Sequence, residues 1–172
     1  MTNNVGKIAA LAFMTALSMV ISMMESYVPI PVPVPGIKLG LANIVTLVLL
    51  TDFGFLQALA VSIARCVLTA VFSGAISAML FSLAGGLSSC FVMGAFYYVI
   101  KMDFSLTGIS IIGAAVHNAA QILVAMFLMR NTAIIYYLPV LILCSIATGF
   151  ITGICATRVS AATRLVFKGF RK

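Results

Sequence analysis

Six long apolar runs, separated by short polar links, dominate the chain. They cover about residues 7–25, 39–51, 55–72, 76–99, 107–128 and 133–157. A bilayer span needs about 20 apolar residues, and in lipid the backbone must satisfy its own hydrogen bonds, so these runs predict transmembrane helices. The second run is short, and we expect it to thin the membrane, recruit flanking residues or be partly re-entrant. The predicted fold class is an all-α membrane protein with six transmembrane helices, forming a single integral membrane domain over residues 1–172.

The composition agrees with a lipid environment. Of the 172 residues, 63% are hydrophobic and 8% are charged, whereas about a quarter are charged in ordinary soluble domains. This length leaves no room for a soluble catalytic or nucleotide-binding domain, so we expect any ATP-driven work to need a partner. The first run lacks a small-residue cleavage site, and we interpret it as a retained helix. The four cysteines lie in apolar segments without paired spacing, which indicates buried thiols rather than disulfides or zinc ligands.

The distribution of basic residues predicts an orientation. With six spans both termini lie on the same side of the membrane. The last fifteen residues hold Arg158, Arg164, Lys168, Arg171 and Lys172. Lys7 and Lys101 fall on the same side, whereas Lys38 and Arg130 fall on the other. The positive-inside rule therefore predicts a multi-pass plasma-membrane protein with both termini in the cytoplasm. We interpret the basic tail as facing membrane lipid rather than nucleic acid.

A proline-rich link, residues 26–38, joins the first two runs. It holds Pro29, Pro31, Pro33 and Pro35. Each proline fixes its own φ and favours extended geometry in the residue before it. We expect a stiff, extended loop on the outer face, which acts either as a spacer or as a lid over an outward-facing pocket. The other links are short, so consecutive helices should pack as antiparallel neighbours. The absence of an internal repeat disfavours an inverted-repeat transporter.

Hydrogen-bonding side chains interrupt the third and fifth runs. Arg65 and His117 each lie near mid-span, where an ionisable group is costly unless it is paired or faces water. In "GAAVHNAAQ", Asn118 and Gln121 follow His117 at spacings that predict one shared helix face. We expect Arg65 and His117 to lie at similar depth. His117 alone also fits an ordinary buried histidine in the core.

Asn43 and Lys38 lie at the outer mouth of the second run, under the proline-rich link. Together with the mid-span groups they form the predicted substrate-binding set: Lys38, Asn43, Arg65, His117, Asn118 and Gln121.

Arg65 lacks an obvious counter-charge. The chain has three acidic residues, Glu25, Asp52 and Asp103, and none falls at the depth of Arg65. A buried guanidinium cannot lose its proton to escape the cost. Either Glu25 is drawn inward or a ligand supplies a phosphate or carboxylate, which Arg can bind with two parallel hydrogen bonds. In the alternative interpretation Arg65 is a clamp between helices, bonded to backbone carbonyls or to Asn118 and Gln121.

Small residues mark close approaches between helices. Gly85 and Gly86 in "SLAGGLSS" favour tight helix packing over ligand contact. On the first helix, Ala9, Ala12 and Ala16 form a face of small residues, which fits either packing within the bundle or docking of a partner subunit.

The order of motifs adds a family resemblance. From about Pro29 to Gln121, "PGIKLGLANIVTL", Arg65, "SLAGGLSS" and "GAAVHNAAQ" together resemble the Gx transporter family, also known as heptaprenyl diphosphate synthase component I. That family in turn is similar to the S components of energy-coupling factor (ECF) vitamin transporters. The resemblance implies a six-helix, ECF S-component-like bundle that binds a micronutrient from outside, under the loop between its first helices.

The resemblance also implies partners and roles. An S component docks on a transmembrane coupling subunit through small residues of its first helix, and paired ATPases power the cycle. Ala12 and Ala16 match that docking step. The family's polar positions are matched by Asn43, Arg65, His117, Asn118 and Gln121. The genes of the family are often described beside quinone and flavin functions, which suggests an isoprenoid- or flavin-related cargo.

The enzyme name in the resemblance does not suit the residues. Prenyl-diphosphate synthases hold magnesium with clustered aspartates, whereas the three acids here are isolated. A nucleophile–base pair is also lacking. We therefore expect no catalytic residues, no metal and no cofactor.

These observations predict a substrate-binding subunit of an ATP-dependent ECF-type importer. Its cargo would be a small anionic micronutrient or an isoprenoid- or flavin-related compound. One alternative is a non-catalytic membrane accessory subunit of an isoprenoid, quinone or flavin-linked electron-transfer system. Another is a secondary carrier that works alone.

Overall fold

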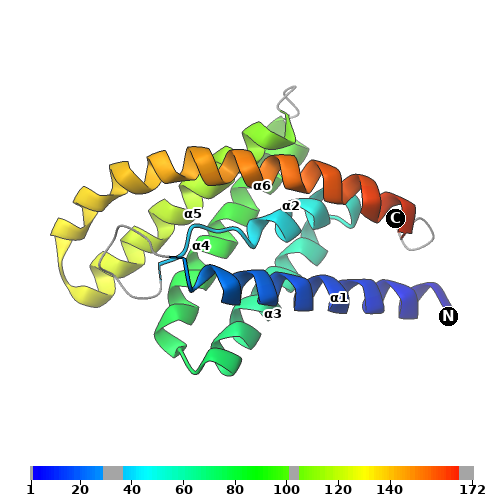
Figure 1. The fold of residues 1–172 in the computed structure, drawn as a ribbon, viewed down its shortest axis with the longest axis horizontal. Coiled ribbons are helices and arrows are strands. Elements are labelled where there is room, and N and C mark those ends of the chain that lie inside the picture. Colours follow the sequence, from blue (N-terminus) through cyan, green and yellow to red (C-terminus); the bar gives the residue numbers. More distant parts are fainter. Residues whose placement is uncertain (1, 29–36, 101–104, 167–172) are drawn as a thin grey trace.

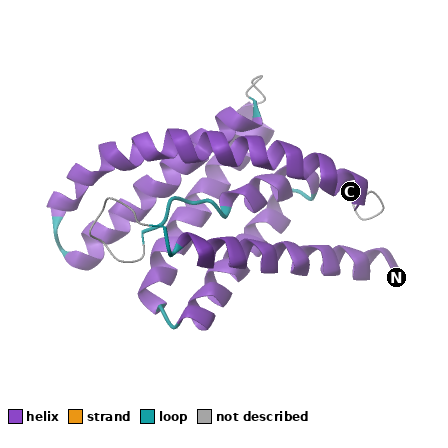
Figure 2. Ribbon diagram, viewed as in Figure 1, coloured by secondary structure: helices purple, strands orange, loops and turns teal. Residues whose placement is uncertain are grey.

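The computed structural model describes residues 2–28, 37–100 and 105–166, all of them helix or loop (Figures 1 and 2). In chain order the elements are α1 (Thr2–Glu25), α2 (Asn43–Asp52), α3 (Phe55–Ser73), α4 (Ile76–Ala95), a π-helical turn η1 (Phe96–Ile100), α5 (Leu106–Met129), a 3₁₀ turn η2 (Thr132–Tyr137) and α6 (Leu138–Val166). The prediction of an all-helical protein is confirmed.

Five stretches of these helices are long and apolar enough to cross a membrane. They are Val5–Glu25, Phe55–Ser73, Ile76–Ile100, Leu106–Met129 and Thr132–Leu165. The protein is therefore a multi-pass helical membrane protein. The start of α1 and the end of α6 lie at the same end of the molecule (Figure 1). Six complete spans, an ECF-like bundle and cytoplasmic termini stay predictions.

The predicted second run, 39–51, differs most from the structure. Its helix, α2, has only 10 residues and begins at Asn43. Gly40 has a φ of 88°, a left-handed conformation that interrupts a helix, so the chain before α2 is a loop (Figure 2). The predicted second run is therefore an irregular segment followed by a short helix. Most of the predicted outer loop, residues 29–36, lies outside the described part of the chain, so its roles as spacer or lid stay predictions.

α2 forms the centre of the bundle and packs against α1, α3, α4, α5 and α6. A helix that is apolar all round must be buried, and Leu47, Val48, Leu49 and Leu50 are each no more than 1% exposed. Phe53, just after the helix, is equally buried. α2 thereby holds the surrounding helices at a fixed separation.

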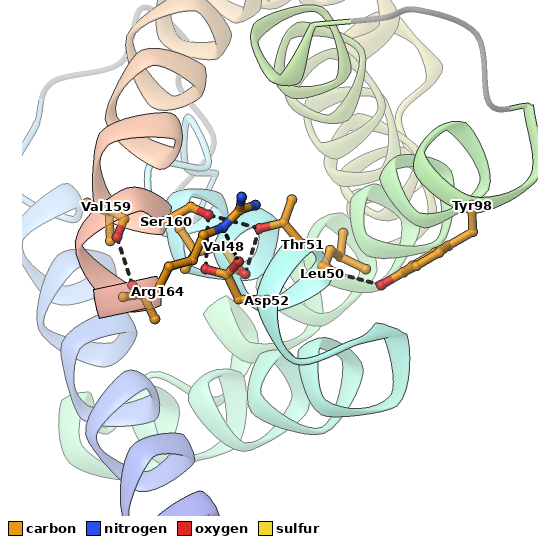
Figure 3. A network of polar contacts seen from close by, with 9 residues as sticks. Val48, Leu50, Thr51, Asp52, Tyr98, Val159, Ser160 and Arg164 are labelled. Atoms are coloured by element: carbon orange, nitrogen blue, oxygen red, sulfur yellow. Dashed lines mark hydrogen bonds and ion pairs between the residues drawn. The ribbon is translucent and has the colours of Figure 1, made fainter. Parts of the chain in front are cut away.

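Polar contacts anchor the C-terminal end of α2 (Figure 3). Arg164 Nε on α6 lies 3.0 Å from Asp52 Oδ1, and Ser160 Oγ donates to Asp52 Oδ2 at 2.9 Å. The Tyr98 hydroxyl on η1 donates to the carbonyl of Leu50. These contacts fix α2 to both α6 and η1.

α6 is longer than a bilayer core requires. Its 29 residues extend about 43 Å at 1.5 Å per residue, against about 30 Å of hydrocarbon. The exposed Arg158 and the half-exposed Arg164 both lie in its last third. The excess length places these charges where headgroups can solvate them.

Candidate functional site

An irregular segment, Ile37–Ala42, runs into the bundle before α2. It is largely buried, and the Lys38 backbone N–H donates to Gln121 Oε1 on α5 at 3.0 Å. At membrane depth, non-helical backbone is tolerated only where protein or a water-filled cavity covers it. Such interrupted spans often build the binding sites of transporters. The segment therefore makes this end of the bundle a candidate binding region.

Glu25, the last residue of α1, is drawn into the same region and is 2% exposed. Its Oε1 accepts hydrogen bonds from the backbone N–H groups of Gly40 and, at 3.2 Å, Leu41. These groups lie just ahead of α2, whose own N-cap residue, Ala42, offers no side-chain acceptor. A carboxylate there complements the positive end of the helix dipole. Glu25 is thus drawn inward, but its carboxylate bonds to this backbone and forms no ion pair with Arg65 in the described part of the chain, so the alternative of a ligand anion stays open.

Lys38 lies beside Glu25 without an ion pair to it. Its Nζ donates to the carbonyl oxygen and the hydroxyl of Ser22 on α1, at 2.9 and 3.1 Å. Burial lowers the pKa of Lys38, and the negative charge of Glu25 opposes that shift. The amine is thus buried and held by one turn of α1.

His117 is the centre of a hydrogen-bonded group at mid-helix. Since Gln121 accepts from Lys38 through its oxygen, its amide nitrogen faces the ring, at 3.1 Å from His117 Nε2. That ring nitrogen must accept, so the imidazole is neutral. The other ring nitrogen, Nδ1, then carries the proton, so Asn43 Nδ2 at 3.4 Å contacts it without donating to it. Ser89 Oγ donates to Asn43 Oδ1 at 3.4 Å. The group joins α2, α4 and α5.

Two glycines of α4 make room for the charged and polar side chains. A Cβ atom at Gly85 would lie 2.8 Å from the ring of His117. A Cβ at Gly86 would lie 3.0 Å from both Arg65 Nη2 and Ser62 Oγ. Arg65 and His117 therefore flank adjacent residues of α4, which agrees with the similar depth expected from the sequence. These contacts indicate that the two glycines provide packing space for the neighbouring side chains.

Arg65 is 2% exposed, and its Nε and Nη2 have no hydrogen-bond partner among the described residues. The described residues also contain no ion pair to it, although the charge of Glu25 acts on it from a distance. Ser62 Oγ and Thr69 Oγ1, on the same face of α3, are buried without partners as well. Buried polar groups normally find partners, so this stripe of unpaired donors requires an explanation.

A cavity of about 240 Å³ lies between the ends of α1, α3 and α4 and the segment before α2. Its polar lining comprises Ser26, Lys38, Thr69, Ser73 and Ser82. Cys66 also lines it, one residue from Arg65, whose guanidinium lies deeper beside Gly86. The cavity is at the end of the bundle where Ser26 and Lys38 lie, which is the outer end in the predicted orientation.

Asn118 is separated from the other predicted site residues. Its Nδ2 donates to Ser145 Oγ at 2.8 Å and to the Leu141 carbonyl at 3.2 Å, both on α6. Neighbouring helix positions point about 100° apart, so Asn118 faces α6 while His117 faces α2 and α4. Its contacts give it a packing role. The predicted single face therefore holds for His117 and Gln121 and excludes Asn118.

The predicted docking residues Ala9, Ala12 and Ala16 are all exposed on α1. The opposite face of α1 is buried through Ala10, Met14, Ser18 and Ser22. The small-residue face therefore lies outside the packed interior of the described bundle, where lipid or a partner could contact it.

Sequence reasoning named Glu25 as a possible inward counter-charge, but it missed several other polar groups near the cavity: Ser22, Ser62, Thr69 and Ser82. A signal for Ser22 was present, because Ser18, Ser22 and Glu25 recur at helical spacing on α1. Among the described residues, no group of three or more His, Cys, Asp or Glu side chains could hold a metal ion. The arrangement can offer a ligand one or two cations, hydroxyl groups and an apolar wall.

Comparisons with known proteins give a family and no closer match. Neither the curated proteins nor the solved structures contain a match to the chain. The model of the family described as heptaprenyl diphosphate synthase component I matches residues 14–159, which include every element of the site from Ser22 to Ser145. The chain therefore belongs to the heptaprenyl diphosphate synthase component I family.

Proposed function

We propose that this protein is the substrate-binding subunit of an ATP-dependent importer of the ECF type. The observation that carries the proposal is the cavity lined by Lys38, with the unpaired guanidinium of Arg65 just beyond its inner wall. A small anionic compound would enter from the outer face. Its charge would be met by Lys38 and Arg65, and its body by the apolar part of the lining. Asn43, His117 and Gln121 would hold the surrounding wall rigid.

The exposed small-residue face of α1 supplies a docking surface in this proposal. Ala9, Ala12 and Ala16 would allow close approach of a helix from a transmembrane coupling subunit. The chain would tip within the membrane on that subunit to release its cargo, and partner ATPases would drive the cycle. The resemblance to ECF S components motivates this step.

We propose that the protein has no enzymatic activity of its own, despite the family name. Of its acids, Glu25 is bonded to the backbone ahead of α2, and Asp52 is paired with Arg164 at the opposite end of that helix. These two could not share a magnesium ion for prenyl transfer. An accessory subunit of an isoprenoid, quinone or flavin-linked electron-transfer system is the second candidate. The family name favours it.

Affinity purification of the tagged chain from its own membranes, in mild detergent, separates the candidates. The proposal predicts co-purification of a transmembrane coupling subunit and ATPases. Ala12→Leu and Ala16→Leu should reduce that recovery, whereas Leu123→Ala, an exposed position on α5, should not. Recovery of a prenyl transferase or electron-transfer enzyme without ATPases would favour the accessory role. Uptake by liposomes containing this chain alone would instead identify a secondary carrier.

A further inference from the structure

The unpaired atoms of Arg65 define the shape of the group that could pair with them. Nε and Nη2 form one edge of the guanidinium, with two parallel N–H groups. Such an edge matches two oxygens on one atom, as in a carboxylate. Ser62 Oγ lies beside it without a partner. We infer that the group captured at the inner end of the cavity is a single carboxylate carried on a small apolar body. This inference rests on the proposed function.

Gly86 lets that edge and the Ser62 hydroxyl pack close to α4. The point where its Cβ would stand is 3.0 Å from Arg65 Nη2, 3.0 Å from Ser62 Oγ and 3.7 Å from Cys66 Sγ. Cys66 also lines the cavity. The thiol therefore borders both the cavity and the spot between the two unpaired donors. A carboxylate in the cavity would reach the guanidinium by displacing the Cys66 side chain, which lines the cavity next to Arg65.

The charges of the region favour a monoanion. The charged groups that act on one another here are Glu25, Lys38 and Arg65, with formal charges of −1, +1 and +1, a sum of +1. His117 is neutral by its bonding, and Asp52 is at the far end of α2, paired with Arg164. One added negative charge neutralises the region. A diphosphate would leave a net negative charge buried, which burial strongly disfavours.

The size of the cavity also favours a small ligand. Its volume of about 240 Å³ is below the roughly 300–1,000 Å³ typical of sites for drug-sized ligands. Much of its wall is apolar, including Ile37, Ala70, Ala78 and Met79. A short hydrocarbon or a single ring fits these dimensions, whereas a long prenyl chain does not. The family name therefore does not describe the cargo of this site.

A head-group series tests the inference. The probes are hexanoate, hexyl phosphate and hexanamide, which share one body and differ in charge. The thermal unfolding midpoint of the purified full chain is measured against probe concentration at neutral pH. Hexanoate should stabilise saturably, with an apparent Kd at least tenfold below that of hexyl phosphate, and hexanamide should have no effect. Arg65→Gln should abolish the hexanoate shift, Ser62→Ala should weaken it several-fold, and the exposed Arg158→Gln should retain it.

Glu25→Gln should change which head group the protein prefers. The substitution removes one negative charge, so the formal charge of the region rises from +1 to +2. The variant should therefore bind hexyl phosphate better, relative to hexanoate, than the wild type does. If the variant fails to fold, Ser62→Ala still tests the subsite. Tighter binding of hexyl phosphate by the wild type, or hexanoate stabilisation that survives Arg65→Gln, overturns the inference.

Failure of all three probes also overturns the inference, while recovery of the coupling subunit and ATPases would leave the proposed function standing. Loss of those partners in the pull-down would instead remove the proposed function.

Discussion

The imidazole of His117 fills the space beside Gly85, where a Cβ atom would lie 2.8 Å from the ring. The ring cannot retreat freely, because Gln121 and Asn43 contact its two nitrogens and Gly40 packs on its opposite edge. Glycine at position 85 is therefore required by the ring, and α4, α5 and the segment before α2 meet at one histidine.

Gly85→Ala should lower the free energy of unfolding by about 1–3 kcal/mol, the usual cost of overpacking a filled interior. The measurement is equilibrium unfolding in detergent. In a His117→Ala background the same change should cost much less, because the clashing ring is gone. Equal costs in the two backgrounds would show that the ring does not determine the need for glycine.

The sequence predicted the helices well, because apolar runs of membrane length have few alternatives. It predicted the path of the second apolar run, residues 39–51, less well. Whether 39–51 is helical throughout depends on Gly40, whose φ of 88° is set by contacts with Glu25, Asn43 and His117. Those contacts are made between distant parts of the chain, and local pattern does not contain them.

The candidate site was predicted in part for a similar reason. Arg65 and His117 stood out because charge and polarity are rare in apolar runs. The inward turn of Glu25 depends on how the chain returns from α1 to α2. The separation of Asn118 from His117 depends on the rotation of α5 against α6, which spacing alone leaves open.

Asn118→Ala should reduce stability without changing probe binding. It loses the bonds to Ser145 Oγ and the Leu141 carbonyl, and hydrogen bonds between membrane helices contribute about 0.5–2 kcal/mol. Gln121→Ala is the matched comparison, since it removes the contacts to Lys38 and His117. Thermal unfolding with and without hexanoate should show lower stability for both variants and weaker binding for Gln121→Ala alone. Weaker binding by Asn118→Ala would return that residue to the site.

Arg164→Gln should destabilise the protein by about 1–2 kcal/mol. The arginine side chain is 49% exposed, but its partner carboxylate on Asp52 is fully buried. Removing the cation leaves that carboxylate less well compensated. Arg158→Gln, an exposed change on the same helix, should stay within about 0.5 kcal/mol of the wild type. Equal stability of the two variants would mean that the ion pair does not anchor α2 to α6.

Lys38 should make stability depend on pH in the alkaline range. Burial lowers its pKa in the folded state below the ordinary value of 10.5. Between the two values the unfolded chain binds more protons than the folded chain, so the free energy of unfolding rises with pH. Unfolding measured from pH 7 to pH 10 should therefore show a steeper rise for the wild type than for Lys38→Met. Glu25, Arg65 and Cys66 are the other titratable groups that act on this amine, and both proteins retain them. An identical slope would contradict the lowered pKa.

The most direct measurement is native mass spectrometry of the chain released from its own membrane lipids. Wild-type protein and Arg158→Gln should each carry one small molecule with a carboxylate group in substantial occupancy. Arg65→Gln should fold, retain its helix content and carry none of it. An empty wild-type protein, or a bound compound retained equally by Arg65→Gln, would contradict the account of Arg65 as the cation that receives an imported anion.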